Sequence, residues 1–374
     1  MKFSSIPGQK DTIDKLICSV REGRVSHAQL FTGPEGCGSL ALAMAYATYI
    51  SCENRNDSDS CGTCRSCVKY EKLIHPDLHF VFPVVKKKEY EPVSDSFIGQ
   101  WRQFAGLSPF FRLNDWLNYI EVENAQGLIY ADEAGEIIKK LSLKTFESDF
   151  KIMIIWLPEK MHPAAANKLL KLIEEPPDKT LFLLVPDEPD KVLPTILSRC
   201  QMLKIPRFGT EDIYRYLTEI KGADAKKAEE TARISNGNIV RAMQLAGQED
   251  SSYGNLENFK KLMRSAWKRD VLSLISWSEE IAVTGREAQK SFLLYSLRII
   301  RENLMLTMGH NADGLISLAD EEASFSKNFH PYINESNIYR LTEEFSLAHS
   351  HVEANGYSKL IFLDLALKVA GIIR

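Results

Sequence analysis

Two uninterrupted apolar runs, separated by one amphipathic helix, constrain the fold of this chain most strongly. The runs KIMIIWL (151–157) and TLFLLV (180–185) have the length of strands, and continuous apolarity is typical of strands that are buried on both faces. Between them, PAAANKLLKLIEEPP (163–177) predicts a helix that begins at Pro163 and is stopped by the pair of prolines at its end. Strand, helix and strand in this order predict a parallel α/β sheet.

The predicted helix has one apolar face, which we expect to be buried against the sheet. Its apolar residues recur at i, i+3, i+4 and i+7, namely Ala166, Leu169, Leu170 and Ile173. A further strand is predicted near the start of the chain, where HAQLFTG (27–33) ends in glycine. An Ala-rich helical pattern follows it from Ser39. The first half of the chain therefore alternates strands and helices.

The sequence pattern changes after KIPRF (204–208). Three short amphipathic helices are predicted there, over 209–220, 226–235 and 238–246. From about residue 250 helical patterns dominate, and Pro331 is the only proline. We therefore predict three domains: an α/β domain over 1–207, a small helical domain over 208–248 and a helical domain over 249–374. Residues 84–116 have no clear period, which indicates an insertion or a long surface loop.

The composition narrows the classes of function. The 374 residues are 44% hydrophobic and 26% charged, as in ordinary globular proteins. The net charge is -4, which argues against tight DNA binding by this chain alone, because such proteins carry a basic excess. No apolar run reaches the roughly 18 residues of a membrane span, and ALAMAYATYI (41–50) predicts a buried helix rather than a signal segment. We expect a soluble, cytoplasmic protein.

Four of the seven cysteines stand close together in the pattern C-x8-C-x2-C-x2-C. They are Cys52, Cys61, Cys64 and Cys67. Four thiolates at this spacing can converge on one tetrahedral Zn²⁺, and the small or polar residues between them argue against scattered thiols of a packed core. An iron–sulfur cluster is the alternative, but its usual run adds a Cys-Pro downstream, where Val68 follows here. We predict structural zinc, since four Cys ligands leave no position open for water.

The segment GPEGCGSL (33–40) is similar to a phosphate-binding loop that lacks its two chemical side chains. Its glycines are Gly33, Gly36 and Gly38. In G-x-x-x-x-G-K-[ST] the Lys binds phosphate and the hydroxyl binds Mg²⁺, but Ser39 and Leu40 occupy those positions here. The glycines are also compatible with a plain strand-to-helix turn, and the helix amides could still hold an anion. We expect no productive ATP binding at this degenerate loop.

The end of the strand over 151–157 lacks a second set of catalytic groups. In nucleotide-hydrolysing folds of this kind the strand ends in Asp-Glu, whereas Trp156 and Leu157 stand there. Glu159 is a candidate for a displaced base, but Pro158 redirects the chain, so a solvated turn residue is the favoured interpretation. Two independent sets of catalytic residues are therefore missing from one site.

Four features occur here in the order found in bacterial clamp-loader subunits of the AAA+ superfamily. They are LFTGPEGCGS, the four-cysteine module, AAANKLLKLIEEPP and LPTILSRC. The sequence resembles this family over about residues 1–250, and beyond that only in length and helical character. Within the family, the delta-prime kind of the DNA polymerase III holoenzyme keeps the cysteines and the Ser-Arg-Cys motif while its nucleotide site is degraded. The sequence resembles this kind.

The resemblance implies a role for Arg199 of the Ser-Arg-Cys motif. An Arg at the end of a short helix is usually a surface salt-bridge partner, but in the family this arginine finger reaches the triphosphate bound by a neighbouring ATPase subunit. A guanidinium supplied in trans neutralises charge on the transferring phosphoryl group. Ser198 and Cys200 are expected to fix the loop. Arg241 matches the lid-domain Arg that senses nucleotide in the family, and is expected to be vestigial here.

The resemblance also implies partners. We expect a heteropentamer of one delta-prime, three ATPase (gamma/tau) subunits and one delta subunit, which places the sliding clamp on primer–template DNA during DNA replication, with residues 249–374 in the collar. No membrane partner is expected. Two alternatives remain open: an autonomous ATP-hydrolysing, gamma/tau-like subunit, and a zinc-dependent nucleic-acid-binding module. ATP turnover by the purified chain would favour the first, and salt-sensitive DNA binding the second.

Overall fold

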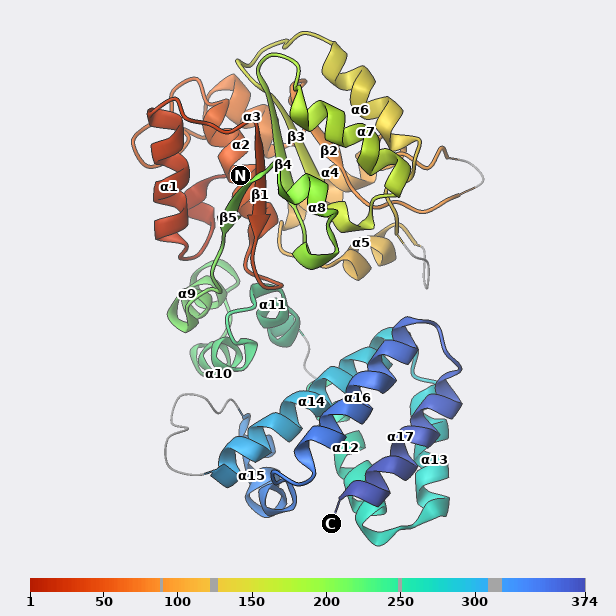
Figure 1. Ribbon diagram of the computed structural model, residues 1–374. Coiled ribbons are helices and arrows are strands. Elements are labelled where there is room, and N and C mark those ends of the chain that lie inside the picture. The colour runs from red at the N-terminus through yellow and green to blue at the C-terminus, as the bar shows by residue number, and fades with distance from the viewer. Residues whose placement is uncertain (88–89, 122–126, 248–250, 309–317, 374) are drawn as a thin grey trace. The chain divides into compact units, whose positions relative to one another are not determined.

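The computed structural model describes residues 1–87, 90–121, 127–247, 251–308 and 318–373. The chain divides into two compact units. The first consists of Met1–Ala228 and Ser235–Met243, and the second of Glu229–Ile234 and Gln244–Arg374. The first unit is α/β and the second is helical, which confirms the predicted fold class (Figure 1).

The first unit is built on a five-stranded parallel sheet in the order β2-β3-β4-β1-β5 (Figure 1). The strands are β1 (Ala28–Thr32), β2 (Leu78–Val81), β3 (Lys151–Trp156), β4 (Thr180–Val185) and β5 (Gln201–Lys204). β3 pairs with β4 over its whole length, from Lys151 opposite Thr180 to Trp156 opposite Val185. Every residue of β1, β3 and β4 is buried, as their continuous apolar runs predict.

Helices cover both faces of this sheet. They are α1 (Lys10–Arg21), α2 (Ser39–Ile50), α3 (Arg65–Glu71), α4 (Ile98–Leu107), α5 (Leu113–Tyr119), α6 (Glu133–Ser142), α7 (Pro163–Glu174) and α8 (Pro194–Leu197). Figure 1 shows α2 on one side of the sheet and α6 and α7 on the other. Every residue of α2 from Leu40 to Ile50 is buried, which confirms the prediction of a buried helix there. Side chains of α6, α7 and α8 share a core with β1, β3 and β4.

The helix predicted after Pro163 is α7, which ends at Glu174, just before the two prolines. Ala166, Leu169 and Ile173 are buried, as predicted. Leu170 is only half-buried, and Ala165 is buried in its place. The stripe that faces the sheet therefore runs through positions 165, 169 and 173, because successive i+4 residues lie almost above one another on a helix.

The prediction of a surface loop over 84–116 is wrong. Outside residues 88–89, which the structure does not describe, this stretch contains α4 and the start of α5. The side chains of Trp101 and Trp116 are fully buried, and the ring of Trp101 stacks on that of Phe82 at a centroid distance of 4.2 Å. These aromatic side chains interlock between short segments, so no single periodic face appears in the sequence.

The helices predicted after residue 208 are confirmed. They are α9 (Thr210–Arg215) with a π-helical turn over Tyr216–Ile220, α10 (Ala225–Ser235) and α11 (Ile239–Gly247). The turn between α10 and α11 has Asn236 and Gly237 with φ of 49° and 76°, as the sequence SNGN favours. A separate domain over 208–248 stays a prediction, and its proposed end falls on residues 248–250, outside the described part of the chain.

The second unit is a bundle of helices. They are α12 (Ser251–Lys268), α13 (Val271–Ala282), α14 (Arg286–Met308), α15 (Asp320–Phe329), α16 (Ile338–Glu353) and α17 (Ser358–Ile372). Its core is rich in aromatic residues, among them Phe259, Trp277 and Phe362. The pairs α14–α16 and α13–α17 are in extensive contact. This unit contains the helical region that the sequence predicts after residue 249.

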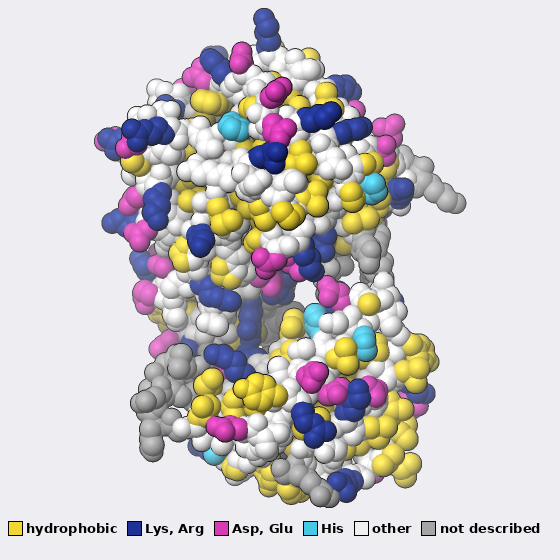
Figure 2. All heavy atoms as spheres, in the orientation of Figure 1, with side chains coloured by type: hydrophobic (Ala, Val, Ile, Leu, Met, Phe, Trp, Pro, Cys, Tyr) yellow, Lys and Arg dark blue, Asp and Glu magenta, His cyan; other side chains and the backbone are white. Residues whose placement is uncertain are grey.

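The surface carries mixed charges. On the face drawn in Figure 2, Lys and Arg side chains are interspersed with Asp and Glu side chains over both units. This distribution agrees with the net charge of -4. Within the described ranges, no helix combines the length and the apolarity needed to cross a membrane.

Candidate functional site

The glycine loop between β1 and α2 has a backbone that only glycine adopts easily. Gly36 and Gly38 have φ of 74° and 82°, in the left-handed region. The carbonyl oxygen of Gly36 accepts the backbone N–H of Ile239 at 3.1 Å, and a Cβ on Gly36 would collide with the side chain of Asn238. The loop is therefore packed against the first turn of α11.

Polar side chains fix the loop further. Nε2 of Gln9 donates to the carbonyl oxygen of Cys37 at 3.2 Å and to that of Pro206 at 2.7 Å. The hydroxyl of Ser39, at the position of the phosphate-binding Lys, is hydrogen-bonded to Sγ of Cys37 at 3.0 Å. The short side chain of Ser39 thus interacts with the loop itself.

Aromatic rings lie against the last glycine of the loop. Phe110 packs edge-on against Phe208 and Tyr216, with ring centroids 6.3 and 5.7 Å apart. A Cβ on Gly38 would lie 2.8 Å from the Phe208 ring and 3.2 Å from the Phe110 ring. These rings therefore occupy the space directly beside the start of α2.

The cavity that remains at the loop is about 40 Å³. It is lined by residues 33–40 of the loop, by residues 109–112, and by Trp156, Val185, Asp187 and Val240. Arg112 of this lining forms an ion pair with Glu35 of the loop. Sites for small molecules are roughly 300–1,000 Å³ in volume, so this cavity is far smaller than such a site.

The end of β3 contributes a wall to the same cavity. Trp156 packs against Trp101 and Phe111, with ring centroids 5.3 and 5.1 Å apart. Leu157, the other residue at the expected acid positions, is buried and has φ of 57°. Both positions thus carry apolar side chains that contribute to packing.

Glu159 is not the solvated turn residue that the sequence favours. Its Oε1 accepts the backbone N–H of Asp187 at 2.9 Å and that of Glu188 at 3.1 Å. Burial raises the pKa of this half-buried carboxyl. Glu159 therefore ties the turn after β3 to the segment after β4, a contact between residues too distant in the sequence for local pattern to reveal.

Arg199 lies where the ends of α7 and α8 meet. Its Nε donates to Oε1 of Glu174 at 2.6 Å, and its Nη2 forms an ion pair with the same oxygen. Its Nη1 donates to the carbonyl oxygen of Thr195 at 2.8 Å and to Oγ of Ser198 at 3.2 Å. The side chain is 35% exposed, so the guanidinium is held in place and still accessible.

The residues on either side of Arg199 make contacts that hold the loop. The hydroxyl of Ser198 donates to the carbonyl oxygen of Thr195 at 3.1 Å. Cys200 packs against the core that α7 and α8 share with the sheet, and burial raises the pKa of its thiol to about 11. Cys200 therefore stays a neutral thiol at physiological pH, in line with a packing role.

Arg241 lies in α11. Its backbone N–H is accepted by Oδ1 of Asn238 at 2.9 Å. The neighbouring Val240 lines the cavity at the glycine loop, but Arg241 is not among the described residues of that lining. The structure thus brings Gly33, Gly36, Gly38 and Ser39 together at the cavity, without Arg241.

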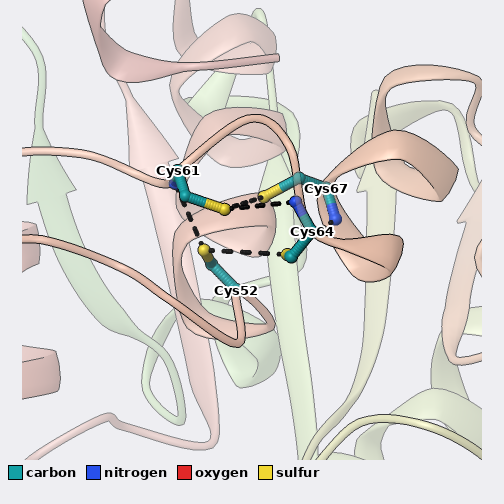
Figure 3. Close-up of side chains that lie close together, drawn as sticks. All are labelled: Cys52, Cys61, Cys64 and Cys67. Atoms are coloured by element: carbon teal, nitrogen blue, oxygen red, sulfur yellow. Dashed lines mark hydrogen bonds between the residues drawn. The ribbon is translucent and has the colours of Figure 1, made fainter.

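The four predicted ligands meet between the end of α2 and the start of α3 (Figure 3). All four Sγ atoms lie within 4.8 Å of one another. The Cys52–Cys64 and Cys61–Cys67 sulfur pairs are 4.0 and 3.9 Å apart. Zn–S bonds of about 2.3 Å in a tetrahedron place the sulfurs about 3.8 Å apart, so the four cysteines could hold a metal ion such as zinc.

Backbone amides surround these sulfurs. The N–H groups of Cys61, Cys64 and Cys67 point at Sγ of Cys52, Cys61 and Cys64 at 3.3, 3.3 and 3.4 Å. The backbone N–H groups of Thr63 and Cys64 are the main cause that lowers the pKa of Cys61 to about 6. Amide donors of this kind stabilise thiolate, which is the form that binds metal.

The sequence alone did not predict a role at these sites for Phe110, Arg112 or Glu174. Phe110 and Arg112 fall in the stretch without a period, and their partners lie far along the chain, so no local signal marks them. Glu174 had a signal, because it belongs to the acidic pair before the two prolines that end α7. That pair occurs in the segment that carries the family resemblance.

With this geometry in place, the comparison with known proteins decides the family. Residues 8–209, more than half of the chain, match the family described as DNA polymerase III, delta subunit. The chain belongs to this family of clamp-loader AAA+ proteins.

Relatives with curated names include both tau and delta-prime subunits of DNA polymerase III. The chain is 21% identical over 388 residues to the tau subunit of Bacillus subtilis DNA polymerase III, covering 98% of this chain and 61% of tau. It is 28% identical over 235 residues to the delta-prime subunit of the same organism, covering 62% of this chain and 57% of that subunit. The chain thus spans about three-fifths of these relatives. Among solved structures, a gamma subunit-related protein of Thermotoga maritima has a TM-score of 0.41 at 14% identity, covering 98% of this chain and 100% of that one.

Proposed function

We propose that this chain is a delta-prime subunit of the DNA polymerase III clamp loader that does not hydrolyse ATP. The observation that carries the proposal is the closed cleft at the glycine loop. A cavity of about 40 Å³, lined by Phe110, Trp156 and the ion pair of Arg112 with Glu35, leaves too little room for a nucleotide. This packing supports the proposal that the loop is retained because the fold needs it.

The charges at the cleft support the same proposal. Ser39 and Leu40 stand where a Lys and a Mg²⁺-binding hydroxyl would hold a triphosphate. The side chains of Glu35 and Asp187 line the cavity, and Arg112 is already paired with Glu35. Burial raises the pKa of Asp187 to about 7. Arg112 is the one cationic side chain in the described lining, and its pairing with a carboxylate makes it a poor partner for a triphosphate, so electrostatics add to the steric obstruction.

The chemistry of the subunit is directed outward through Arg199. We propose that its guanidinium contacts the triphosphate bound by a neighbouring ATPase subunit and stabilises the charge that develops during phosphoryl transfer to water. The partial exposure of Arg199 and its place at the junction of two helix ends support this role. An Arg suits it because the guanidinium stays charged and presents a planar fork of donors.

Zinc would serve the fold of the first unit. Cys52, Cys61, Cys64 and Cys67 would supply all four ligands, which leaves no coordination position for water or substrate. The ion would cross-link the end of α2 to α3, in a segment with few apolar residues. We propose a structural ion with no part in the reaction.

The partners proposed for this chain are those of a clamp loader. In a heteropentamer with gamma/tau and delta subunits, the helices of residues 249–374 would form its part of the collar. The assembly would open the sliding clamp and close it around primer–template DNA in the cytoplasm. The delta-prime and tau relatives support membership of such a complex.

A second candidate is an autonomous ATP-hydrolysing, gamma/tau-like subunit. One observation favours it, since the match to the Bacillus subtilis tau subunit covers 98% of this chain, against 62% for the delta-prime subunit. The closed cleft and the missing Lys argue against it.

Turnover of ATP by the purified chain separates the two candidates. We expect no phosphate release above buffer with Mg–ATP, with or without primed DNA. A variant in which Ser39 and Leu40 are replaced by Lys and Thr serves as control and is expected to stay inactive, because Trp156 and Leu157 still replace the acids. Turnover on the order of 1 s⁻¹ by the unaltered chain would instead establish the autonomous ATPase.

A further inference from the structure

Glu174 is the contact that ties Arg199 to another element of the fold. The two acceptors of Nη1, Thr195 and Ser198, belong to α8 and its end, the same short segment that carries Arg199. Glu174 is the last residue of α7 and receives both Nε and Nη2. The preceding residue, Ile173, is fully buried in the core under the sheet. The backbone at Glu174 is therefore anchored beside the core under the sheet.

The contacts use most of the guanidinium and leave part of it free. A guanidinium has five N–H donors in a fixed plane. Nε donates once, Nη1 twice and Nη2 once in the contacts made by Glu174, Thr195 and Ser198. One Nη2 hydrogen remains, on a side chain that is 35% exposed. The fork is thus held in one orientation with a donor left for an external acceptor.

We propose that Glu174 is a positioning residue that orients the Arg199 guanidinium for the neighbouring triphosphate; this inference rests on the proposed function of Arg199. A free Arg side chain samples many rotamers, and fixing one of them before the subunits meet removes that entropy cost from the reaction. The effect of Glu174 is therefore exerted through Arg199, and Glu174 itself touches no substrate.

The carboxylate also has an opposing effect, because it reduces the positive charge that Arg199 offers. The side chains of Glu174 and Arg199 are 45% and 35% exposed, and ion pairs at such a surface are weak and screened by solvent. A triphosphate carries several negative charges and competes easily with one screened carboxylate for the guanidinium. Orientation is thus the larger of the two effects, and the sign of the mutant effect tests this ranking.

The test uses the assembled clamp loader, in which this chain carries Glu174→Ala or Glu174→Gln. Glu174→Ala is expected to lower kcat of DNA-stimulated ATP hydrolysis about tenfold, the order of the rotamer freedom that is regained, with KM for ATP unchanged. Glu174→Gln is expected to stay within about twofold of the unaltered complex, because its amide oxygen still accepts the Nε–H of Arg199. Glu175→Ala removes a neighbouring carboxylate that is also exposed and serves as control.

Three results would count against the positioning role as it is proposed here. A higher kcat in Glu174→Ala would mean that the carboxylate lowers the activity of Arg199. An unchanged kcat would mean that Glu174 has no effect on catalysis. The melting temperatures of the isolated variants are measured alongside, and a loss of kcat is assigned to positioning when Glu174→Ala melts at the same temperature as the unaltered chain. A tenfold loss in both variants, with KM unchanged, would also contradict the role of the accepted hydrogen bond.

A double-mutant cycle separates this inference from the proposed function. If Glu174 acts through Arg199, then Arg199→Ala and the double variant Arg199→Ala/Glu174→Ala have the same kcat. If Arg199→Ala itself leaves kcat unchanged, the role of Arg199 in trans is wrong and the positioning role with it. If Arg199→Ala lowers kcat while Glu174→Ala does not, only the positioning role is wrong.

Discussion

The charged side chains differ in accessibility between the cleft at the glycine loop and the surface around Arg199. In the cleft, Arg112 is paired with Glu35 of the loop itself, and rings such as that of Phe110 occupy the adjacent space. At the other surface, Arg199 is held by Glu174 yet stays 35% exposed. In the cleft, the Arg112 guanidinium is paired within the protein. At the other surface, the Arg199 guanidinium keeps a donor available for an external acceptor.

Under the proposed function, this difference explains how the loop can be retained without binding a nucleotide. The glycine conformations at Gly36 and Gly38, and the contact of the loop with Asn238, are needed for packing between β1, α2 and α11. A cationic side chain at Ser39 is not needed for that packing.

Arg199→Ala tests the surface around Arg199 and has the largest expected effect. We expect DNA-stimulated ATP hydrolysis by the assembled complex to fall about 10³-fold or more, because the charge of the phosphoryl group loses its neutralising partner. Clamp loading should fall with it, while assembly measured by size-exclusion chromatography stays intact. Arg215→Ala, which removes another half-exposed, ion-paired Arg, is the control and should leave turnover unchanged. Equal turnover in both variants would remove the distinction between the two regions.

Cys64→Ser tests the metal module that is proposed for the first unit. We expect the zinc content measured by mass spectrometry to fall from one ion per chain, and the melting temperature to drop by on the order of 10 °C, because the ion contributes directly to folding. Cys18→Ser replaces an exposed thiol outside the cluster and should change neither value. An unchanged melting temperature after complete loss of zinc would make the ion peripheral.

Phe110→Ala tests the packing in the cleft at the glycine loop. The buried ring is lost from contact with Phe208 and Tyr216, so the free energy of unfolding in urea should fall by about 3 kcal/mol. Phe146→Ala, at a ring that is 79% exposed, should cost less than about 0.5 kcal/mol. The Phe110→Ala variant should gain no ATP turnover, because Ser39 still stands in place of the phosphate-binding Lys. Turnover gained by Phe110→Ala would show that the ring alone blocks a competent site.

Gln9→Asn removes a smaller support of the same loop. The shorter amide cannot reach the carbonyl oxygens of Cys37 and Pro206, and Asn tolerates the left-handed φ of 57° at this position. We expect a loss of about 1 kcal/mol in the free energy of unfolding. Lys10→Ala, at the exposed neighbouring residue, is the control. A loss in the control as large as that in Gln9→Asn would mean that the amide does not brace the loop.

The sequence predicted the framework of the fold well and the closure of the cleft not at all. β3 and β4 were recognised because their continuous apolar runs are a local signal, and α7 because Pro163 marks its start. Phe110 was missed because the rings that pack against it belong to Phe208 and Tyr216, about a hundred residues later in the chain.

Glu159 illustrates the same limit for a polar residue. A Glu in a turn is usually solvated, which is what the sequence favoured. In the folded chain the backbone N–H groups of Asp187 and Glu188 bind its carboxylate. Burial and hydrogen bonding across the sheet are properties of the tertiary structure, so a residue of this kind is identified only when distant segments are brought together.

The most direct measurement of the central claim is a high-resolution structure of the assembled complex with a Mg²⁺-bound, non-hydrolysable ATP analogue. The account predicts that the Arg199 guanidinium lies within hydrogen-bond distance of the γ-phosphate in a neighbouring subunit, and that the cleft beside Gly38 contains no nucleotide. An analogue bound in that cleft, or an Arg199 guanidinium remote from every nucleotide, would contradict it.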